Sequence, residues 1–230
     1  TAEPAEPQPL QPNASLHMLA AQLMAADAER LQNPALSLNR VVYDSNEPLD
    51  MATNPFVTAE SLHSVHPPLS KRKEAAAAAA AAAANNNGGA AGEPSAAAAL
   101  RFESRFESGN LRRAVQVSEY EYDLILRPDA NTRGHTQWFY FGVAKMKHGP
   151  LYKFNVVNCV KPDSLFNAGM LPLVYSTKEV ARTGLGWRRM GHNVCYYQNH
   201  IKRRTGYYYT ASFQVTARQP ATSHHHYLHL

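Results

Sequence analysis

Histidine is the residue type that first suggests chemistry here, because the 230-residue sequence contains eleven of them. A zinc site on a helix needs two ligands about one turn apart, for example a histidine followed three residues later by glutamate. No histidine in this sequence has a glutamate at that spacing. His63 and His66 have a suitable interval but precede two prolines, and His192 with Cys195 is one pair without a second. The sequence therefore predicts no metal site and no cofactor in this chain.

Motifs for nucleophilic catalysis and phosphate binding are missing from the sequence as well. It contains no Gly-x-Ser-x-Gly elbow, no P-loop and no Gly-x-Gly-x-x-Gly loop. Its two cysteines, Cys159 and Cys195, are too few for a disulfide framework, so we expect free thiols in a reducing compartment. We therefore expect no catalytic residue in this chain.

The charge of the chain changes sign near residue 100. Residues 1–99 hold 5 Lys/Arg and 10 Asp/Glu, a net charge of −5, whereas residues 100–230 hold 18 and 8, a net charge of +10. The second half contains three basic runs: Arg112-Arg113, Arg188-Arg189 and Lys202-Arg203-Arg204. With the neighbouring tyrosines, such runs could bind single-stranded nucleic acid or an acidic protein, or could simply form a solvated basic face.

Aromatic residues divide the chain at the same place, and this division predicts its domain organisation. Only Tyr43 and Phe56, of 22 aromatic residues, lie in the first 99 positions. A segment so poor in aromatics cannot bury enough apolar area to offset its ordering entropy. We expect residues 1–43 to be mostly disordered, with a possible short helix at 15–30, and residues 44–99 to form a low-complexity linker. The longest apolar run, ten alanines, is too short to span a membrane.

Residues 100–216 show the alternation of half-buried strands. In Glu119–Arg127 every second residue is apolar, and Thr136–Val143 is rich in aromatic residues. Turn residues such as Pro128-Asp129 separate these segments. Three further strands are expected at Leu151–Asn158, Val194–Tyr197 and Tyr207–Val215. This spacing predicts a mainly β fold, an antiparallel β-sandwich that follows a long disordered and low-complexity N-terminal region.

Several ordered sequence blocks in this region resemble the N-terminal domain of the cytosolic carboxypeptidases, in particular the Nna-type branch that processes tubulin. The blocks are collinear and cover about residues 100–216. They read LRFESRFESGNLRR at 100–113, EYDL at 121–124, HTQWFYF at 135–141, YKFNVVN at 152–158, KPDSLFNAGMLPLVYS at 161–176, GWRRMG at 186–191 and YYQN at 196–199.

The resemblance implies a β-sandwich domain that precedes a zinc carboxypeptidase domain. The family removes glutamates from polyglutamate side chains or C-terminal tails of tubulin and other proteins. Zinc and the catalytic residues belong to the downstream domain, so this chain alone is expected to be inactive. The implied partners are that downstream domain and tubulin or other glutamylated proteins, without a membrane and without nucleic acid. The implied location is the cytosol, with the nucleus as a second possibility.

The resemblance ends near Thr216. Residues 217–230 form a histidine-rich tail that looks unrelated, where the family continues with the segment that completes the sandwich. The sequence therefore predicts a sandwich that lacks its last strand. Unpaired strand edges and uncovered apolar faces favour aggregation, so we expect the isolated chain to fold poorly.

The +10 charge of the second half would attract acidic tails over a distance, and salt would weaken this attraction. The candidate contacts with an acidic substrate are Arg188, Arg189, Lys202, Arg203 and Arg204. The alternative hypothesis is a stand-alone sandwich module that binds an acidic protein, nucleic acid or carbohydrate without any protease.

Overall fold

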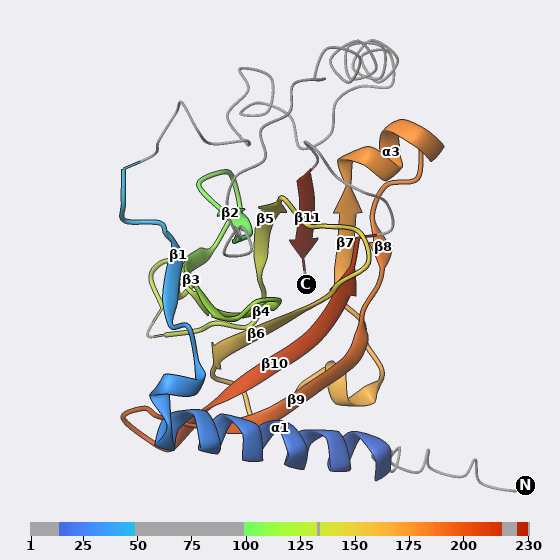
Figure 1. Ribbon diagram of the computed structural model, residues 1–230. Coiled ribbons are helices and arrows are strands. Elements are labelled where there is room, and N and C mark those ends of the chain that lie inside the picture. The colour runs from blue at the N-terminus through green and yellow to red at the C-terminus, as the bar shows by residue number, and fades with distance from the viewer. Residues whose placement is uncertain (1–13, 49–98, 133, 218–224, 230) are drawn as a thin grey trace, which may run out of the picture.

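The computed structural model describes residues 14–48, 99–132, 134–217 and 225–229, and these form two stacked β-sheets and a covering helix (Figure 1). Among the described residues, sheet A has six strands in the order β1-β3-β4-β6-β10-β9, and sheet B has five in the order β2-β5-β11-β7-β8. The strands are β1 Arg40–Asp44, β2 Arg101–Glu103, β3 Leu111–Ser118, β4 Glu121–Leu126, β5 Tyr140–Ala144, β6 Leu151–Cys159, β7 Leu173–Ser176, β8 Arg188–Arg189, β9 His192–Lys202, β10 Tyr207–Thr216 and β11 His225–His229. The helical elements are α1 Ala14–Gln32, η1 Pro34–Leu36, η2 Leu165–Ala168 and α3 Thr177–Thr183.

The alternation seen in the sequence becomes the two faces of each strand. In β4, Tyr122, Leu124 and Leu126 are buried against sheet B, while the residues between them face outward. This strand pairs with β3 in the antiparallel sense and with β6 in the parallel sense. All other ladders of the two sheets are antiparallel, so the predicted antiparallel sandwich is confirmed.

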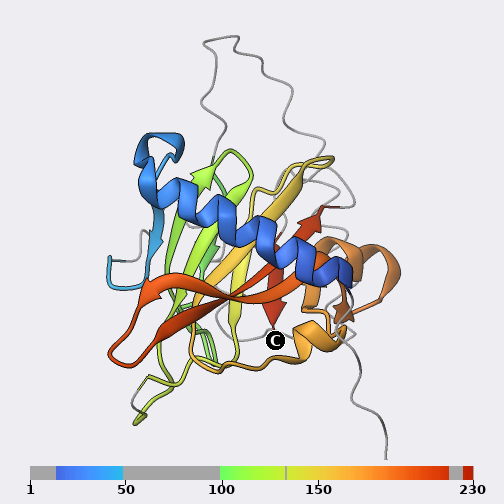
Figure 2. The ribbon, with the colours of Figure 1, turned by 90° about the horizontal axis from the view of Figure 1, so that it is seen from below.

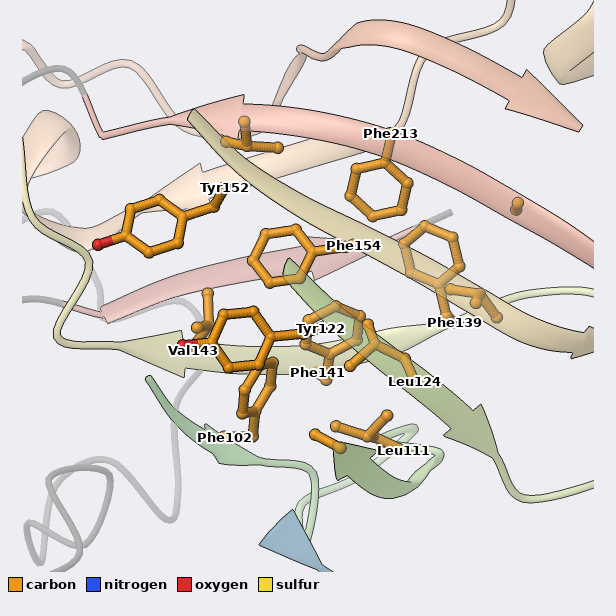
Figure 3. Close-up of a cluster of buried hydrophobic side chains, with 14 of the residues drawn as sticks. Phe102, Leu111, Tyr122, Leu124, Phe139, Phe141, Val143, Tyr152, Phe154 and Phe213 are labelled. Carbon is orange, nitrogen blue, oxygen red and sulfur yellow. The ribbon is translucent and has the colours of Figure 1, made fainter. Parts of the chain in front are cut away.

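Aromatic rings from both sheets fill the space between them (Figure 3). Phe154 and Phe213 of sheet A are fully buried, with ring centroids 5.8 Å apart. Phe141 of sheet B lies 6.3 Å from Phe154, and Phe139 stacks on Phe213 at 5.5 Å. Aromatic side chains bury more apolar area than any other type. The concentration of aromatic residues after residue 100 therefore reflects this single core.

A tight turn between β2 and β3 joins the sheets. Gly109 is required there, because a Cβ atom at this position would lie 2.1 Å from the Ser104 carbonyl oxygen. The buried side chain of Asn110 then bonds the main chain at the start of β5 in sheet B. Its Nδ2 donates to the Trp138 carbonyl at 2.8 Å, and its Oδ1 accepts from the Tyr140 N–H at 2.9 Å.

The edge strand β9 is protected by a side chain. The side-chain amide of Asn167, in η2, pairs with the main chain of Tyr196, donating to its carbonyl at 2.9 Å and accepting from its N–H at 3.1 Å. Asn167 thus takes the place of a neighbouring strand at this residue. Such protection prevents edge strands from pairing with other chains.

The first half of the chain contributes more structure than its composition predicts. The expected helix at 15–30 is present as α1, and β1 joins sheet A beside β3, so the described residues from 14 onward hold regular elements where residues 1–43 were expected to be mostly disordered. Tyr43 is the physical reason, since its ring is buried in the core and its hydroxyl bonds Ser104. Residues 1–13 and most of the expected linker, 49–98, lie outside the described residues.

The expectation of a missing last strand is also corrected. Residues 225–229 form β11, which lies between β5 and β7 in sheet B. Ladder hydrogen bonds join backbone groups, so a segment that does not resemble the family in sequence can still pair with both neighbouring strands, provided that proline does not interrupt it. The part of the tail that the structure describes therefore belongs to the sandwich. Poor folding of the isolated chain stays a prediction.

The thiols of Cys159 and Cys195 are both free and buried. In the described part of the chain, no helix is both long and apolar enough to cross a membrane.

Candidate functional site

The five candidate basic residues lie in two groups that the fold keeps apart. Arg188 and Arg189 form β8, at the edge of sheet B, whereas Lys202, Arg203 and Arg204 lie where β9 turns into β10. Strand β9, which is 11 residues long and ends at Lys202, separates the two groups by roughly 30 Å at about 3.3 Å per residue. Figure 1 shows β8 and the β9–β10 turn on opposite sides of the molecule. One acidic segment therefore meets only one group at a time unless it is long.

The group at β8 is largely committed to internal contacts. The Arg188 Nη2 lies 4.0 Å from Glu179 Oε2, a carboxylate that also binds Arg182 at 2.6 Å. The Arg189 Nη1 donates to the Leu171 carbonyl at 2.7 Å. Arg188 therefore shares one carboxylate with Arg182, and Arg189 uses one of its donors for a main-chain carbonyl.

The second group, which we call the basic hairpin (Lys202–Tyr207), carries exposed and uncompensated charge. None of the ion pairs found among the described residues involves Lys202, Arg203 or Arg204. The turn is closed by the Arg203 N–H, which donates to the Gly206 carbonyl at 3.0 Å. Gly206 has φ of +90°, a value that favours glycine. Tyr207 adds a partly exposed aromatic ring.

Beside the basic hairpin lies a cavity of about 220 Å³, between α1, η1 and the end of β9. The outer face of sheet A forms its floor, and α1 crosses this face diagonally (Figure 2). Leu31, Val157 and Ile201 supply apolar walls. His200 and Ile201 line the cavity and are followed directly by Lys202, so the cavity and the basic hairpin share one strand.

A charge network holds α1 in place next to the cavity. Arg30 binds Asp27 of its own helix at 2.5 Å, and its Nη1 lies 3.6 Å from carboxylate oxygens of both Glu121 and Asp123 on β4. Asp27 also accepts a hydrogen bond from the Tyr197 hydroxyl at 2.9 Å. Arg30 therefore links the helix to carboxylates that would otherwise repel one another.

The two carboxylates of β4 respond differently to this environment. Burial by itself would raise the pKa of Glu121, but Lys153 at 2.9 Å and the Asn155 amide hold it below its ordinary value. Burial raises the pKa of Asp123 above its ordinary value, against the attraction of Arg30. The Asn155 Nδ2 donates to both carboxylates, at 2.8 and 2.9 Å.

No metal centre is assembled among the described residues. Nowhere in the described ranges do three His, Cys, Asp or Glu side chains come close enough together to hold a metal ion. His192 and Cys195 lie on one strand but in different surroundings. His192 is exposed, whereas the Cys195 thiol is buried under α1, 3.9 Å from the Leu16 carbonyl. Burial raises the pKa of Cys195, which keeps it as a thiol.

The cavity and the charge network were not predicted from the sequence. The alternation of β4 predicts that Glu121 and Asp123 face away from the core, and they do. The sequence gives no direct sign that a helix more than 90 positions earlier covers them with Arg30. The one available signal was the Asp27–Arg30 spacing on a predicted helix, which places both side chains on one face.

Comparison with known proteins gives one matching family model. The model describes the cytosolic carboxypeptidase N-terminal domain and matches residues 102–223, just over half of the chain and beyond the expected boundary at 216. Human cytosolic carboxypeptidase 4 is 50% identical over 125 residues, which cover 51% of this chain and 11% of that protein. Cytosolic carboxypeptidase 1 of Gallus gallus is 47% identical over 125 residues, with 51% and 10% covered.

Cytosolic carboxypeptidase 2 of Danio rerio is 52% identical over 104 residues, which cover 45% of this chain and 14% of that protein. The chain therefore spans roughly a tenth of the length of the curated relatives that it matches. Among solved structures, a metallo-carboxypeptidase from Burkholderia cenocepacia matches with a TM-score of 0.37 and 17% identity, covering 56% of this chain and 28% of that one.

Proposed function

The chain belongs to the family of the cytosolic carboxypeptidase N-terminal domain, and from this premise we propose that it is the accessory domain of a zinc metallocarboxypeptidase. The proposed substrates are the glutamate-rich tails of tubulin and other proteins, in the cytosol and also in the nucleus. The chain itself contributes no catalytic group. The 50% identity to human cytosolic carboxypeptidase 4 over 125 residues supports the assignment.

Zinc belongs in this proposal to the part of the enzyme outside the match. The described residues do not fit the metal, because no group of three suitable ligands comes together in them. No step of the hydrolysis is therefore assigned to this chain, whose proposed task is to bind and orient the acidic substrate for the partner domain.

The observation that carries the binding role is the uncompensated charge of the basic hairpin. Polyglutamate is a dense, flexible anion, and exposed cations attract it over about a Debye length, roughly 8 Å at physiological salt. Lys202 and Arg204 are exposed and have no carboxylate partner among the described ion pairs. Arg188 is a weaker candidate, because its guanidinium lies 4.0 Å from the Glu179 carboxylate.

The test is to titrate the chain with a glutamylated tubulin-tail peptide and with the unmodified tail, at low and at moderate salt. We expect tighter binding of the glutamylated peptide and a loss of affinity with salt. Equal affinity for both tails would overturn the charge-based proposal. Salt-insensitive binding of the unmodified tail would favour a stand-alone binding module.

Two double variants, each with two fewer positive charges, test whether the acidic tail binds at the basic hairpin. Lys202→Gln with Arg204→Gln removes two charges from the basic hairpin. Lys145→Asn with Lys147→Gln removes two exposed charges near the opposite end of β10, roughly 30 Å away by strand length. Asparagine suits Lys145 because that residue has φ of +67°. Only the first pair should weaken binding; equal losses would mean that net charge alone is responsible.

A further inference from the structure

The cavity and the basic hairpin form a continuous surface with two different chemistries. Ile201 lines the cavity and the next residue, Lys202, begins the hairpin. The hairpin and the C-terminal end of α1 lie on the same side of the molecule in both views (Figures 1 and 2). A peptide bound along the hairpin therefore passes the mouth of the cavity.

The size of the cavity limits what it can accept. Pockets for whole small molecules usually measure about 300–1,000 Å³, whereas this cavity measures about 220 Å³. It has room for one side chain of a longer ligand. Its apolar walls, Leu31, Val157 and Ile201, favour a branched aliphatic group.

The charged groups of the cavity exclude an acidic side chain. Asp27 and Asp123 both line it, and Arg30 is the cation between them. These carboxylates already have partners, because Asp27 binds the Tyr197 hydroxyl and Asp123 binds the Asn155 amide. A glutamate entering the cavity would meet like charge and lose its hydration, while Arg30 is already shared among the carboxylates of Asp27, Glu121 and Asp123. An uncharged side chain carries neither penalty.

We propose that the cavity and the basic hairpin together form one composite peptide site, which binds an acidic segment interrupted by a single uncharged, branched apolar residue. The hairpin holds the acidic residues, and the cavity takes the apolar side chain. The inference rests on the proposed function for its acidic ligand, and it adds a sequence preference that charge alone does not supply.

The experiment compares glutamate-run peptides that differ at one central position, which is Leu, Ala or Glu. Their affinities for the full chain are measured by fluorescence anisotropy at fixed salt. We expect the Leu peptide to bind about 15-fold more tightly than the Ala peptide, the effect of burying about two of the three carbons by which the side chains differ. The Glu peptide should bind no better than the Ala peptide, despite its larger charge.

A blocked cavity supplies the decisive control. Ser37 lines the cavity and its neighbour Ala35 is exposed and does not line it. Ser37→Trp should abolish the preference for Leu over Ala, while Ala35→Trp should keep it. Thermal unfolding of both variants verifies that each is folded.

The outcomes separate this inference from the proposed function. If Lys202→Gln with Arg204→Gln weakens all three peptides equally but the wild type shows no preference for Leu, the composite site is refuted and the acidic-tail role stands. If the wild type binds none of the peptides, both fail. A Leu preference that survives Ser37→Trp would place the apolar contact elsewhere and refute the cavity as its site.

Discussion

Replacement of Gly109 by alanine should be among the most damaging single changes in the domain. The new Cβ would lie 2.1 Å from the Ser104 carbonyl oxygen and 2.8 Å from its carbon, where real contacts are not found below 3.0 Å. The turn must therefore move by about 1 Å. Ser104 resists this movement because it is fully buried and its Oγ donates to the Leu111 carbonyl at 2.7 Å.

The expected cost follows from these contacts. Overpacking of a rigid site costs about 1–3 kcal/mol, and each hydrogen bond lost from Ser104 adds about 1 kcal/mol. We expect Gly109→Ala to lower the free energy of unfolding by about 3 kcal/mol, measured by urea denaturation. The matched control is Gly186→Ala, whose Cβ would meet only the Tyr175 ring at 3.9 Å and should cost under about 0.5 kcal/mol. A loss below about 1 kcal/mol for Gly109→Ala would refute the reasoning.

Three further predictions concern ion pairs and the strand edge. The Asn46 N–H, together with Arg113 and Arg112, holds the pKa of Asp44 below its ordinary value. The ionised Asp44 carboxylate therefore stabilises the fold fully at any pH above the ordinary carboxyl pKa. This stabilisation is lost as the pH falls through the lowered pKa of Asp44 in the folded protein. Asp44→Asn should therefore make the free energy of unfolding fall less steeply with decreasing pH on the acid side, measured by urea denaturation at several pH values. An unchanged pH dependence would contradict this. Arg30→Met should cost about 2 kcal/mol, less than a fully buried pair because the side chain is 22% exposed, and should speed hydrogen exchange in α1 but not in β6. Asn167→Ala should unpair the main chain of Tyr196 and increase aggregation in light scattering, whereas Ala168→Ser should not.

The sequence was informative where structure depends on neighbouring residues. The alternation in Glu119–Arg127 predicted β4, and the aromatic residues after residue 100 predicted the sandwich core. Each of these features follows from periodicity or composition within about ten residues.

Contacts between distant parts of the chain could not be predicted in this way. Arg30 meets Asp123 across more than 90 residues, and β1 pairs with β3 across a segment whose composition predicts a linker. The placement of β11 depends on backbone pairing, which side-chain patterns do not report. The separation of Arg188 from Lys202 depends on the full length of β9, which the sequence pattern predicted as only four residues, Val194–Tyr197.

The most direct test of the account is hydrogen exchange of the chain with and without the glutamylated tubulin-tail peptide, read residue by residue. We predict slower exchange at residues 202–207, the basic hairpin, when the peptide is bound, and no change at Arg188 and Arg189 of β8. Protection at β8 alone, or no protection anywhere under conditions where binding is measured, would contradict the assignment of acidic-tail binding to the hairpin.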